Sequence, residues 1–309
     1  MIQFYQTIHN QMLKIGEFTE GCWVNVIRPT PEELTYLVDP LGLESDFVRA
    51  ALDEEESSRI ENEDSQTLVL VDIPILTSED NNTVLYTTRP LGILLTDTNI
   101  ITISLQDTPV ISDFARGAIR NVQTQLKTRF LLQLLLRGAT QYLTYLKQID
   151  KITSSLESKL DKSMKNRLLM QLLGLEKSLV YFSTSLKADE ITLEKILRGR
   201  VIKMYEDDQD LLEDVLIEVK QAIEMSSIYL NILSGTMDAF ASVISNNLNI
   251  VMKVLASITI VISIPNIIAG FYGMNVEGLP LAQFFWFPIV LALVLMGVVS
   301  WILHKKNML

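Results

Sequence analysis

The sequence predicts an α+β domain followed by a very long helix and a second helix, with both helices apolar enough at the C-terminal end to cross a membrane. Three observations predict this fold class. Short β-rich runs lie between residues 67 and 104, segments with leucine at helical spacing follow from about residue 122, and residues 254–303 contain one formally charged side chain, Glu277. The 309 residues are 48% hydrophobic and 20% charged, too apolar for an ordinary soluble protein and too charged for a purely membrane-embedded one.

The charge and the rare residue types exclude several classes of function. A net charge of −11 argues against a nucleic-acid partner, which would need a basic face, and an acidic surface suits cations. The single cysteine, Cys22, excludes an internal disulfide framework and a thiolate zinc cluster. The sequence has no Gly-x-x-x-x-Gly-Lys-Ser/Thr signature, and no nucleophile, base and orienting group can be assembled from its motifs. We therefore expect neither direct ATP coupling nor an enzyme.

Residues 1–120 are expected to form a cytoplasmic α/β domain. Thr30-Pro31-Glu32-Glu33 is a capping box with proline at the first helical position, and it predicts a short helix to about Val38. Four short β-rich runs separated by turn residues predict a sheet with hairpins, and they cover residues 67–76, 83–89, 92–96 and 100–104.

Residues 121–250 are expected to form a cytoplasmic helical region. The periodicity predicts helices over 130–149 and 152–186. No proline occurs between Pro109 and Pro265, so one continuous helix is predicted from about residue 205 to 271. Such a helix, about 67 residues at 1.5 Å each, would be roughly 100 Å long, far more than a bilayer. It would run from the cytoplasm through the membrane, and its apolar stripe would need partners.

The apolar run predicts two membrane spans, 251–271 and 284–303, joined by a short extracytoplasmic loop, 272–283. Aromatic residues lie near both ends of the second span, as expected for the aromatic belts at the two membrane–water interfaces. The first residues do not read as a signal peptide. Lys253 and the basic tail 304–309 flank the spans, so the positive-inside bias puts both termini in the cytoplasm. The alternative is a buried hairpin in a soluble protein.

Polar and small residues share one face of the first span. Steps of three and four residues from Asn249 give the series Asn249, Met252, Ala256, Thr259, Ser263, Asn266 and Gly270, with Ser245, Ser242 and Asp238 before it. Such a face is costly against lipid. It could permit close helix packing, or it could line a water-filled pore. Because two spans are too few to enclose a channel, the pore interpretation requires a homo-oligomer with cyclic symmetry.

The tetrapeptide Tyr272-Gly273-Met274-Asn275 directly follows the first span. Its position, at the end of the penultimate helix of a chain whose last helix stops six residues before the terminus, makes it specific. The sequence here resembles the CorA family of divalent-cation channels, which carries a Gly-Met-Asn signature at this place. The resemblance extends upstream through residues 249–255 and 268–271, and the long helix and acidic N-terminal domain fit it over the whole chain.

The resemblance implies a homopentameric, funnel-shaped, two-span channel in the plasma membrane that mediates passive Mg²⁺ uptake, with Co²⁺ and Ni²⁺ also permeant. The first span would be the pore helix. Gly273, Met274 and Asn275 would form the selectivity filter, with the Asn275 amide oxygen contacting the water shell of the ion. Polar rings and an apolar constriction would lie further along the pore, the rings at Asp238 and Asn249 and the constriction at Met252 and Leu255.

Neutral amide oxygens suit Mg²⁺, because this ion holds six waters tightly and dehydrates reluctantly. The alternative for Asn275 is a left-handed residue that caps the helix C-terminus. One departure from the family pattern concerns the outer loop, where 278–281 lacks a glutamate that the family often has and only Glu277 is charged. This predicts weak attraction of cations at the outer mouth.

Two acidic clusters suggest regulation by a cation. Residues 206–224 contain eight acids and one base, and a second cluster begins at Asp53 and Glu54. Such runs form solvated faces, or they place carboxylates of neighbouring subunits close enough for a divalent cation to bridge. In the family that this sequence resembles, intracellular Mg²⁺ closes the channel, and Asp214 matches a regulatory aspartate by its spacing to Asn249. Asp53 and Glu54 are candidate partners of Asp214.

Two rival functions stay open at this point. The first is a zinc or other transition-metal transporter on the same fold, which competition between ions would reveal. The second is a membrane-anchored metal sensor that conducts nothing, which absence of flux from pure protein would reveal.

Overall fold

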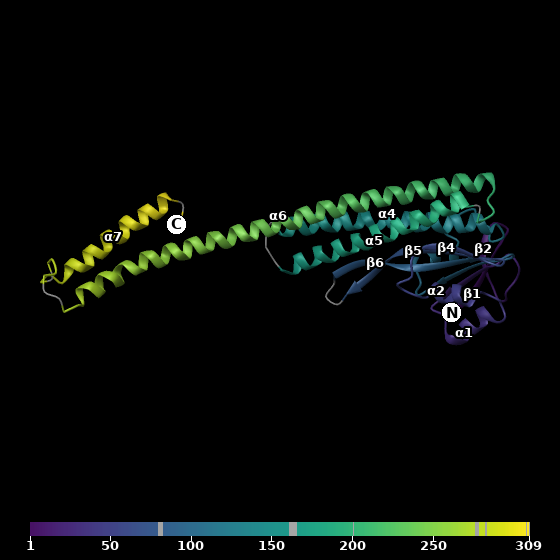
Figure 1. Ribbon diagram of the computed structural model, residues 1–309, viewed down its shortest axis with the longest axis horizontal. Coiled ribbons are helices and arrows are strands. Elements are labelled where there is room, and N and C mark those ends of the chain that lie inside the picture. Colours follow the sequence, from purple (N-terminus) through teal and green to yellow (C-terminus); the bar gives the residue numbers. More distant parts are fainter. Residues whose placement is uncertain are drawn as a thin grey trace. The chain divides into compact units, whose positions relative to one another are not determined.

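The computed structural model describes residues 1–79, 83–160, 166–199, 201–275, 278–281, 283–306 and 308. The chain forms two compact units, Met1–Ser234 and Gly235–Leu309. The first unit contains all the strands and most of the helices of the described chain, and the second contains the C-terminal part of α6 (Glu206–Tyr272) and α7 (Trp286–Lys305) (Figure 1). The expected domain limits at residues 120 and 250 stay predictions.

A seven-stranded sheet forms the centre of the first unit, in the order β2-β1-β3-β7-β6-β5-β4. Only the β3–β7 pair is parallel among these neighbours, and the other pairs are antiparallel. The strands are β1 (Ile2–Ile8), β2 (Gln11–Ile15), β3 (Trp23–Ile27), β4 (Arg59–Glu63), β5 (Gln66–Glu79), β6 (Thr83–Leu95) and β7 (Ile100–Ser104).

Helices cover both faces of this sheet (Figure 1). The short helices α1 (Pro31–Val38) and α2 (Ser45–Ala50) bury Leu37 and Phe47 in a core that includes Val24 and Ile101 from the strands. At Gly92 the sheet and α2 approach so closely that a β-carbon would overlap the side chain of Ala51. Only glycine therefore fits at this point of β6.

The opposite face carries α3 (Pro109–Ala115), α4 (Lys127–Leu160) and α5 (Asn166–Gly199). Aromatic rings fill this side of the core. The ring centroids of Trp23 and Phe130 lie 5.3 Å apart, and those of Tyr142 and Phe182 lie 5.0 Å apart. The indole nitrogen of Trp23 donates a hydrogen bond of 2.9 Å to the Thr102 hydroxyl, so its buried polar atom is satisfied.

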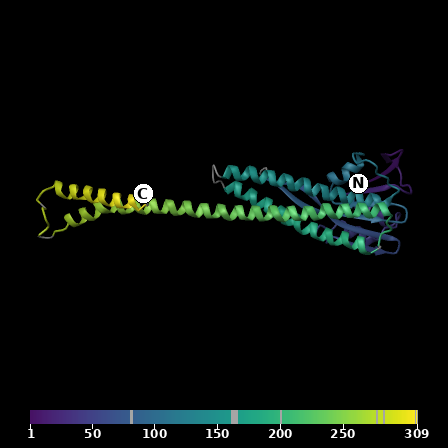
Figure 2. The same cartoon turned by 90° about the horizontal axis from the view of Figure 1, so that it is seen from above.

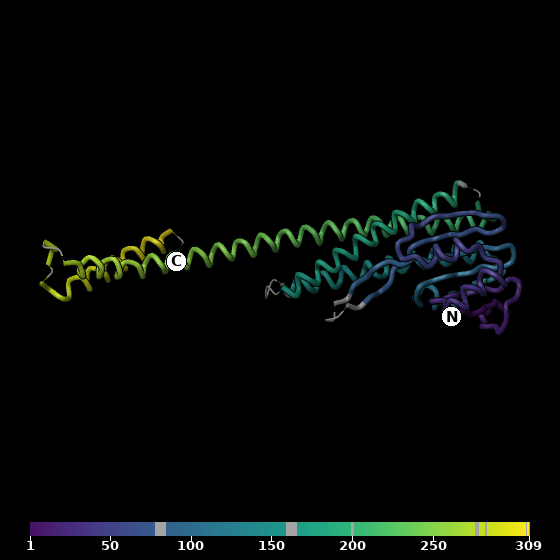
Figure 3. Tube along the Cα trace, turned by 60° about the horizontal axis from the view of Figure 1, so that its bottom comes forward, coloured from purple at the N-terminus to yellow at the C-terminus, as the bar shows by residue number. Residues whose placement is uncertain are grey.

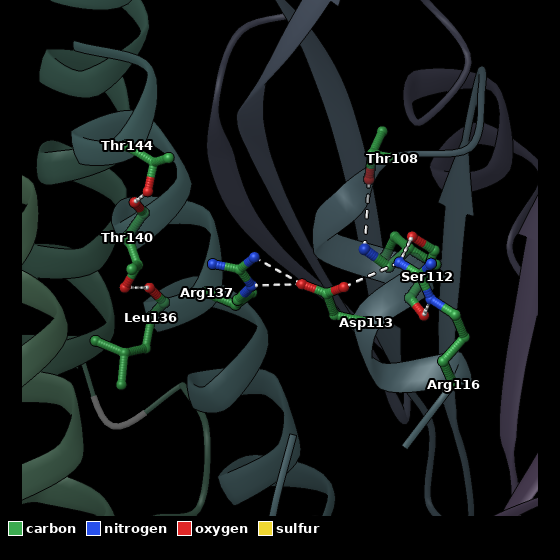
Figure 4. Close-up of polar contacts among 9 residues, drawn as sticks. Thr108, Ser112, Asp113, Arg116, Leu136, Arg137, Thr140 and Thr144 are labelled. Atoms are coloured by element: carbon green, nitrogen blue, oxygen red, sulfur yellow. Dashed lines mark hydrogen bonds and ion pairs between the residues drawn. The ribbon is translucent and has the colours of Figure 1, made fainter. Parts of the chain in front are cut away.

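An ion pair joins α3 to α4 (Figure 4). The Arg137 guanidinium donates from Nε and Nη2 to Oδ2 of Asp113 at 3.0 and 2.6 Å, and Arg116 donates to the other carboxylate oxygen at 3.0 Å. Both Asp113 and Arg137 side chains are largely shielded from solvent, unlike the i,i+4 pair of Arg198 with Glu194. A forked, partly buried pair of this kind stabilises packing more than an exposed one.

Buried polar groups join α5 to the sheet. Asp189, 5% exposed, accepts hydrogen bonds from the Ser58 hydroxyl at 2.8 Å and from the backbone N–H of Asp72 at 3.0 Å. The Ser185 hydroxyl donates to the carboxylate of Asp72 at 2.5 Å. Two carboxyl groups therefore lie in one buried network, and neither has a basic partner within the part of the chain that the structure describes.

The first turns of α6 pack along the helices of the first unit. Leu212, Val215 and Ala222 are buried, and the Ser226 hydroxyl donates to the carbonyl of Leu179 on α5 at 3.0 Å. Helical structure then continues without interruption past Gly235 and Pro265 to Tyr272. The continuous helix expected from about residue 205 to 271 is confirmed.

The capping box is confirmed, since the Thr30 hydroxyl accepts from Glu33 N at 3.3 Å and the Glu33 carboxylate from Thr30 N at 2.9 Å. The separation of 83–89 from 92–96 is wrong, because both belong to β6. Pro90 is tolerated in this strand because the β6–β7 pairing begins only at Leu91, so the missing N–H breaks no bond there.

The predicted break between helices at residues 149–152 is also wrong. α4 passes through this point to Leu160, because nothing in the local sequence stops a helix, and α5 begins at Asn166. Four strands, β1 to β4, were not predicted individually, and the turn at Asp80–Asn82 lies outside the described residues.

The buried network predicts a pH-dependent stability. Burial, and then the nearby Asp72, raise the pKa of Asp189 well above its ordinary value of 3.8, so the folded protein keeps a proton that the unfolded chain releases. Stability is therefore lost as the pH rises from about 4 through the raised pKa. We expect Asp189→Asn to raise the unfolding midpoint of the purified full-length protein at pH 7.5 and to change it little at pH 4.

Thermal unfolding in detergent at a series of pH values measures this effect. Asp210→Asn, at an exposed carboxylate, is the matched control and should leave the pH profile of stability as it is in the parent protein. An Asp189→Asn variant that is less stable than the parent at pH 7.5 would show that the ionised carboxylate is the stabilising form.

Candidate functional site

The second unit contains two helices that are long and apolar enough to cross a membrane, α6 in its C-terminal part and α7. Figure 2 shows α7 alongside the end of α6, and Figure 3 shows the chain turning back between them. The Ser257 hydroxyl of α6 donates a hydrogen bond of 2.8 Å to the backbone carbonyl of Met308, just beyond the C-terminal end of α7. At the other end, the ring of Tyr272 lies 6.2 Å from that of Phe287.

One face of the first span is covered within the chain. Ser257 is fully buried and Ile268 is 8% exposed, and Val261 and Tyr272 are half-buried. These residues recur at steps of about three and four, which is the spacing of a single helix face. Since Phe287 belongs to α7 and Met308 lies just beyond its C-terminal end, this is the face turned toward α7.

The predicted polar stripe points mostly away from this face. At roughly 100° per residue, its members from Asn249 to Gly270 point on average about 140° away from the face centred on Ser257 and Ile268. Ser263 is half-buried and the other predicted pore residues are exposed in the single chain, namely Asp238, Asn249, Met252, Leu255, Ala256, Thr259, Asn266 and Gly270. The stripe is therefore not used to pack α6 against α7.

The hydroxyl groups of the stripe are satisfied by their own helix. Thr259 donates to the carbonyl of Leu255 at 2.8 Å, Ser263 donates to that of Thr259 at 2.8 Å, and Ser242 donates to that of Asp238 at 3.0 Å. Each hydroxyl oxygen keeps lone pairs free to accept a further hydrogen bond. These three hydroxyl groups thus present acceptors without needing a second helix to satisfy their donors.

The Gly-Met-Asn segment ends α6. The backbone N–H of Gly273 still donates to Ala269 at 2.9 Å, and a β-carbon at position 273 would lie only 3.1 Å from that carbonyl oxygen. Met274 N donates to the carbonyl of Phe271 at 3.3 Å, which tightens the last turn. A side chain at position 273 would therefore crowd this carbonyl oxygen, and the role of Gly273 in shaping the loop stays a prediction.

Asn275 is exposed, and its amide has no hydrogen-bond partner among the described residues. Its φ angle is not positive, so it does not adopt the left-handed conformation of the alternative capping interpretation. Just before it, the Tyr272 hydroxyl donates to the carbonyl of Pro280 at 2.9 Å and joins the two ends of the loop. Glu277, the one charged residue of the loop, lies outside the described residues.

The three candidate regulatory residues belong to the first unit and are exposed. Asp53 accepts a hydrogen bond from Glu55 N at 3.1 Å, and Glu54 forms an ion pair with Arg89. Asp214 lies on α6. In the described part of one chain, no three His, Cys, Asp or Glu side chains come together as a group that could hold a metal ion.

Two residues that shape this region were not predicted from the sequence. Tyr272 was quoted only as part of the motif, although a tyrosine at the start of a short loop is a signal for a hydroxyl contact across it. Ser257 gave no such signal, because its partner is a backbone carbonyl 51 positions away.

Comparison with known proteins gives one consistent family. The family described as CorA-like Mg²⁺ transporter protein matches residues 19–305. The cobalt/magnesium transport protein CorA of Methanocaldococcus jannaschii is 29% identical over 297 residues, which cover 92% of this chain and 90% of that one. The protein of the same name from Thermotoga maritima is 34% identical over 137 residues, covering 40% of this chain and 38% of the relative.

A solved structure agrees with the sequence comparison over the full length. The complete structure of the CorA magnesium transporter from Methanocaldococcus jannaschii matches with a TM-score of 0.85 at 25% identity, covering 100% of this chain and 99% of that one. The soluble α/β domain, the long helix and the second apolar helix are therefore all shared with it. The chain belongs to the CorA-like Mg²⁺ transporter family, whose members are membrane ion-transport proteins and not enzymes.

Proposed function

We propose that this protein is a homopentameric channel for passive Mg²⁺ uptake in the plasma membrane, with both termini in the cytoplasm. Family membership supports transport of Mg²⁺, and the names of the two relatives add Co²⁺. Ni²⁺ is proposed as a further permeant ion. The observation that carries the pore proposal is the polar stripe of α6, which points mostly away from α7 and is largely exposed in the single chain.

A closed ring of copies gives this stripe a suitable environment. Polar groups facing lipid are costly, and α7 does not cover them. If the stripes of several α6 helices converge on one axis, their hydroxyl and amide groups meet water instead. Cyclic symmetry places each residue of the stripe in a ring, so Met252 and Leu255 form apolar rings and Asn249 a polar one.

The membrane potential supplies the driving force. Moving a divalent ion through 100 mV releases about 4.6 kcal/mol, which is sufficient for uptake without ATP. A ring of Asn275 amides contacts the ion through its water shell, so the ion need not lose its six waters before it enters. The exposed and unpartnered amide supports this role.

Asp214 is proposed to close the channel when cytoplasmic Mg²⁺ is high. Carboxylates on neighbouring copies repel one another until a divalent cation bridges them, and occupancy then stabilises the closed arrangement. Asp53 is the better candidate partner, because Glu54 is already paired with Arg89 within its own chain. A transporter that excludes Mg²⁺ and a silent sensor are less well supported, because the family description and the names of both relatives include magnesium transport.

The filter is tested by Mg²⁺ influx into liposomes that contain the purified protein and carry an inside-negative potential. Loss of a hydrogen-bonding group costs about 1–3 kcal/mol, so Asn275→Ala should lower the initial rate roughly tenfold or more. Gln283→Ala, an exposed amide in the same loop, is the matched control and should keep the parent rate. Zn²⁺ is added as a competing cation.

Equal rates for Asn275→Ala and the parent protein would remove Asn275 from the filter. Zn²⁺ flux without Mg²⁺ flux would favour the transition-metal transporter, and no flux of either ion would favour the sensor.

The regulatory proposal is tested by varying Mg²⁺ on the cytoplasmic face while influx or current is measured. Asp214→Lys replaces a bridging ligand by a fixed positive charge, so closure should no longer depend on Mg²⁺ over the millimolar range. Lys187→Glu, which changes an exposed charge on α5, should leave the Mg²⁺ dependence of closure unchanged. An Asp214→Lys channel that closes at the same Mg²⁺ concentration as the parent would refute the assignment.

A further inference from the structure

A cavity of about 520 Å³ lies in the first unit and is lined by described residues. It lies where three parts of the fold meet, namely the ends of β5 and β6, the first turn of α4, and the connection from α5 to α6. Its volume falls within the range of about 300–1,000 Å³ that small-molecule sites occupy. This cavity is remote in sequence from the stripe and from the Gly-Met-Asn loop, and the proposed transport does not use it.

Positive charge is concentrated around this cavity, in a protein whose net charge is −11. Lys127, Arg129 and Lys203 all line it. The first turn of α4 includes two of these residues and has no acidic residue, although the N-terminus of a helix is itself positive and ordinarily attracts acids. An anion bound here would relieve repulsion that the two acids of the lining, Asp207 and Asp208, compensate only in part.

The basic groups are held in place, and their charge is neutralised only in part, by the ion pair of Arg129 with Asp207. The Lys127 ammonium donates to the backbone carbonyls of Thr96 and Asp97 at 2.5 Å each, which leaves one of its three donors. The guanidinium of Arg129 is 3.8 Å from the carboxylate of Asp207, too long for a hydrogen bond. Lys203 lies 5.9 Å from the centre of the Tyr205 ring. All three can turn donors toward a ligand.

The remaining walls are apolar and aromatic. Leu95 and Ile202 are almost fully buried and form the inner part, whereas Leu126 and Tyr205 stand at the opening with 44% and 64% of their surface exposed. A flat ring could lie against such side chains while its charged end reached the basic groups. The cavity thus combines a surface for a planar apolar group with a site for several negative charges.

Two acids complete the lining. Asp208 is buried and its carboxylate accepts a hydrogen bond of 3.2 Å from the backbone N–H of Tyr205, so it serves to cap α6. Asp207 is exposed and lies beside Arg129. A single exposed carboxylate next to basic groups suits a phosphate chain that carries Mg²⁺, because the metal bridges phosphate and carboxylate oxygens.

We propose that this cavity binds a nucleoside di- or triphosphate as its Mg²⁺ complex, with the phosphates at Arg129, Lys203 and Lys127 and the base at Leu126 and Tyr205. The proposal is for binding alone, and no hydrolysis step is part of it. A bound complex of this kind would make the cytoplasmic domain responsive to the nucleotide-bound pool of Mg²⁺.

Isothermal titration of the purified full-length protein with Mg²⁺-ATP tests the site. Tripolyphosphate and adenosine serve as separate probes of the two halves of the ligand. We expect Mg²⁺-ATP to bind at least about tenfold more tightly than either probe, since each probe makes only part of the contacts. Arg129→Glu and Lys203→Glu should each weaken ATP binding about tenfold or more, whereas the control Lys187→Glu, at an exposed lysine of α5 outside the cavity, should not.

The proposal fails if ATP does not bind, if tripolyphosphate binds as tightly as ATP, or if the two variants bind ATP like the parent. The unfolding midpoint of each variant is measured alongside, and photo-labelling of the parent protein with 8-azido-ATP gives a readout that does not depend on variants. Label in the peptides that contain residues 125–129 or 201–208 supports the site, and label elsewhere overturns it.

Discussion

The structure depends on one constraint, which is that α6 must satisfy its backbone polar groups internally along all 67 residues. Helical hydrogen bonding does this from Glu206 to Tyr272, with Pro265 the one position that lacks an N–H. Because the backbone is satisfied, the side chains alone decide what each face contacts. In the first unit, Leu212 and Val215 are buried, and in the second unit Ser257 and Ile268 are. In the second unit the polar stripe stays largely exposed in the single chain, beside apolar side chains such as Ile258 and Ile262.

The two faces of α6 make different contacts, and this explains how a chain with two candidate spans could contribute to a conduction pathway. The face centred on Ser257 and Ile268 is occupied by contacts within the chain, and the face that points mostly away from it keeps Thr259, Ser263 and Asn266 for other contacts. The hydroxyls of Thr259 and Ser263 bond to their own helix, so they need no partner helix to be stable. Close helix packing through small residues would instead bury this face against its neighbour.

In the first unit, the burial of two carboxyl groups beside the sheet costs free energy of desolvation. Asp72 and Asp189 are placed between β5 and α5 without a basic partner in the described chain, and the hydroxyls of Ser58 and Ser185 compensate only part of their desolvation. The aromatic contacts of Trp23 with Phe130 and of Tyr142 with Phe182 supply the apolar burial that holds α4 and α5 in place. The polar network fixes the register of α5 against the sheet, and the aromatic core provides stability.

Local signals in the sequence sufficed for some of these features. The capping box at Thr30 and Glu33 and the long helix were predicted, because short-range hydrogen bonds and the absence of breakers determine them. The helix break near residue 150 was misplaced because no residue there stops a helix. Pro90 was taken as the end of a strand, since only the tertiary pairing of β6 with β7 reveals that its missing N–H is harmless there.

The sequence likewise predicted only part of the candidate site. Heptad spacing identified the stripe, but which face α7 covers depends on contacts such as Ser257 with Met308, for which the sequence has no pattern. The buried position of Asp189 and the cavity at Arg129 and Lys203 were not predicted for the same reason. They arise where segments far apart in the chain meet.

The central claim is that the stripe of α6 faces water and the opposite face does not. It is tested most directly by introducing single cysteines in a Cys22→Ala background and treating the protein in membranes with a charged, thiol-specific reagent, which modifies thiolates only where water reaches them. The account predicts that cysteines at Thr259 and Ser263 react quickly and that their modification blocks Mg²⁺ flux, whereas cysteines at Val261 and Ile268 react slowly. Equal reaction rates on the two faces, or faster reaction at Val261 and Ile268, would contradict it.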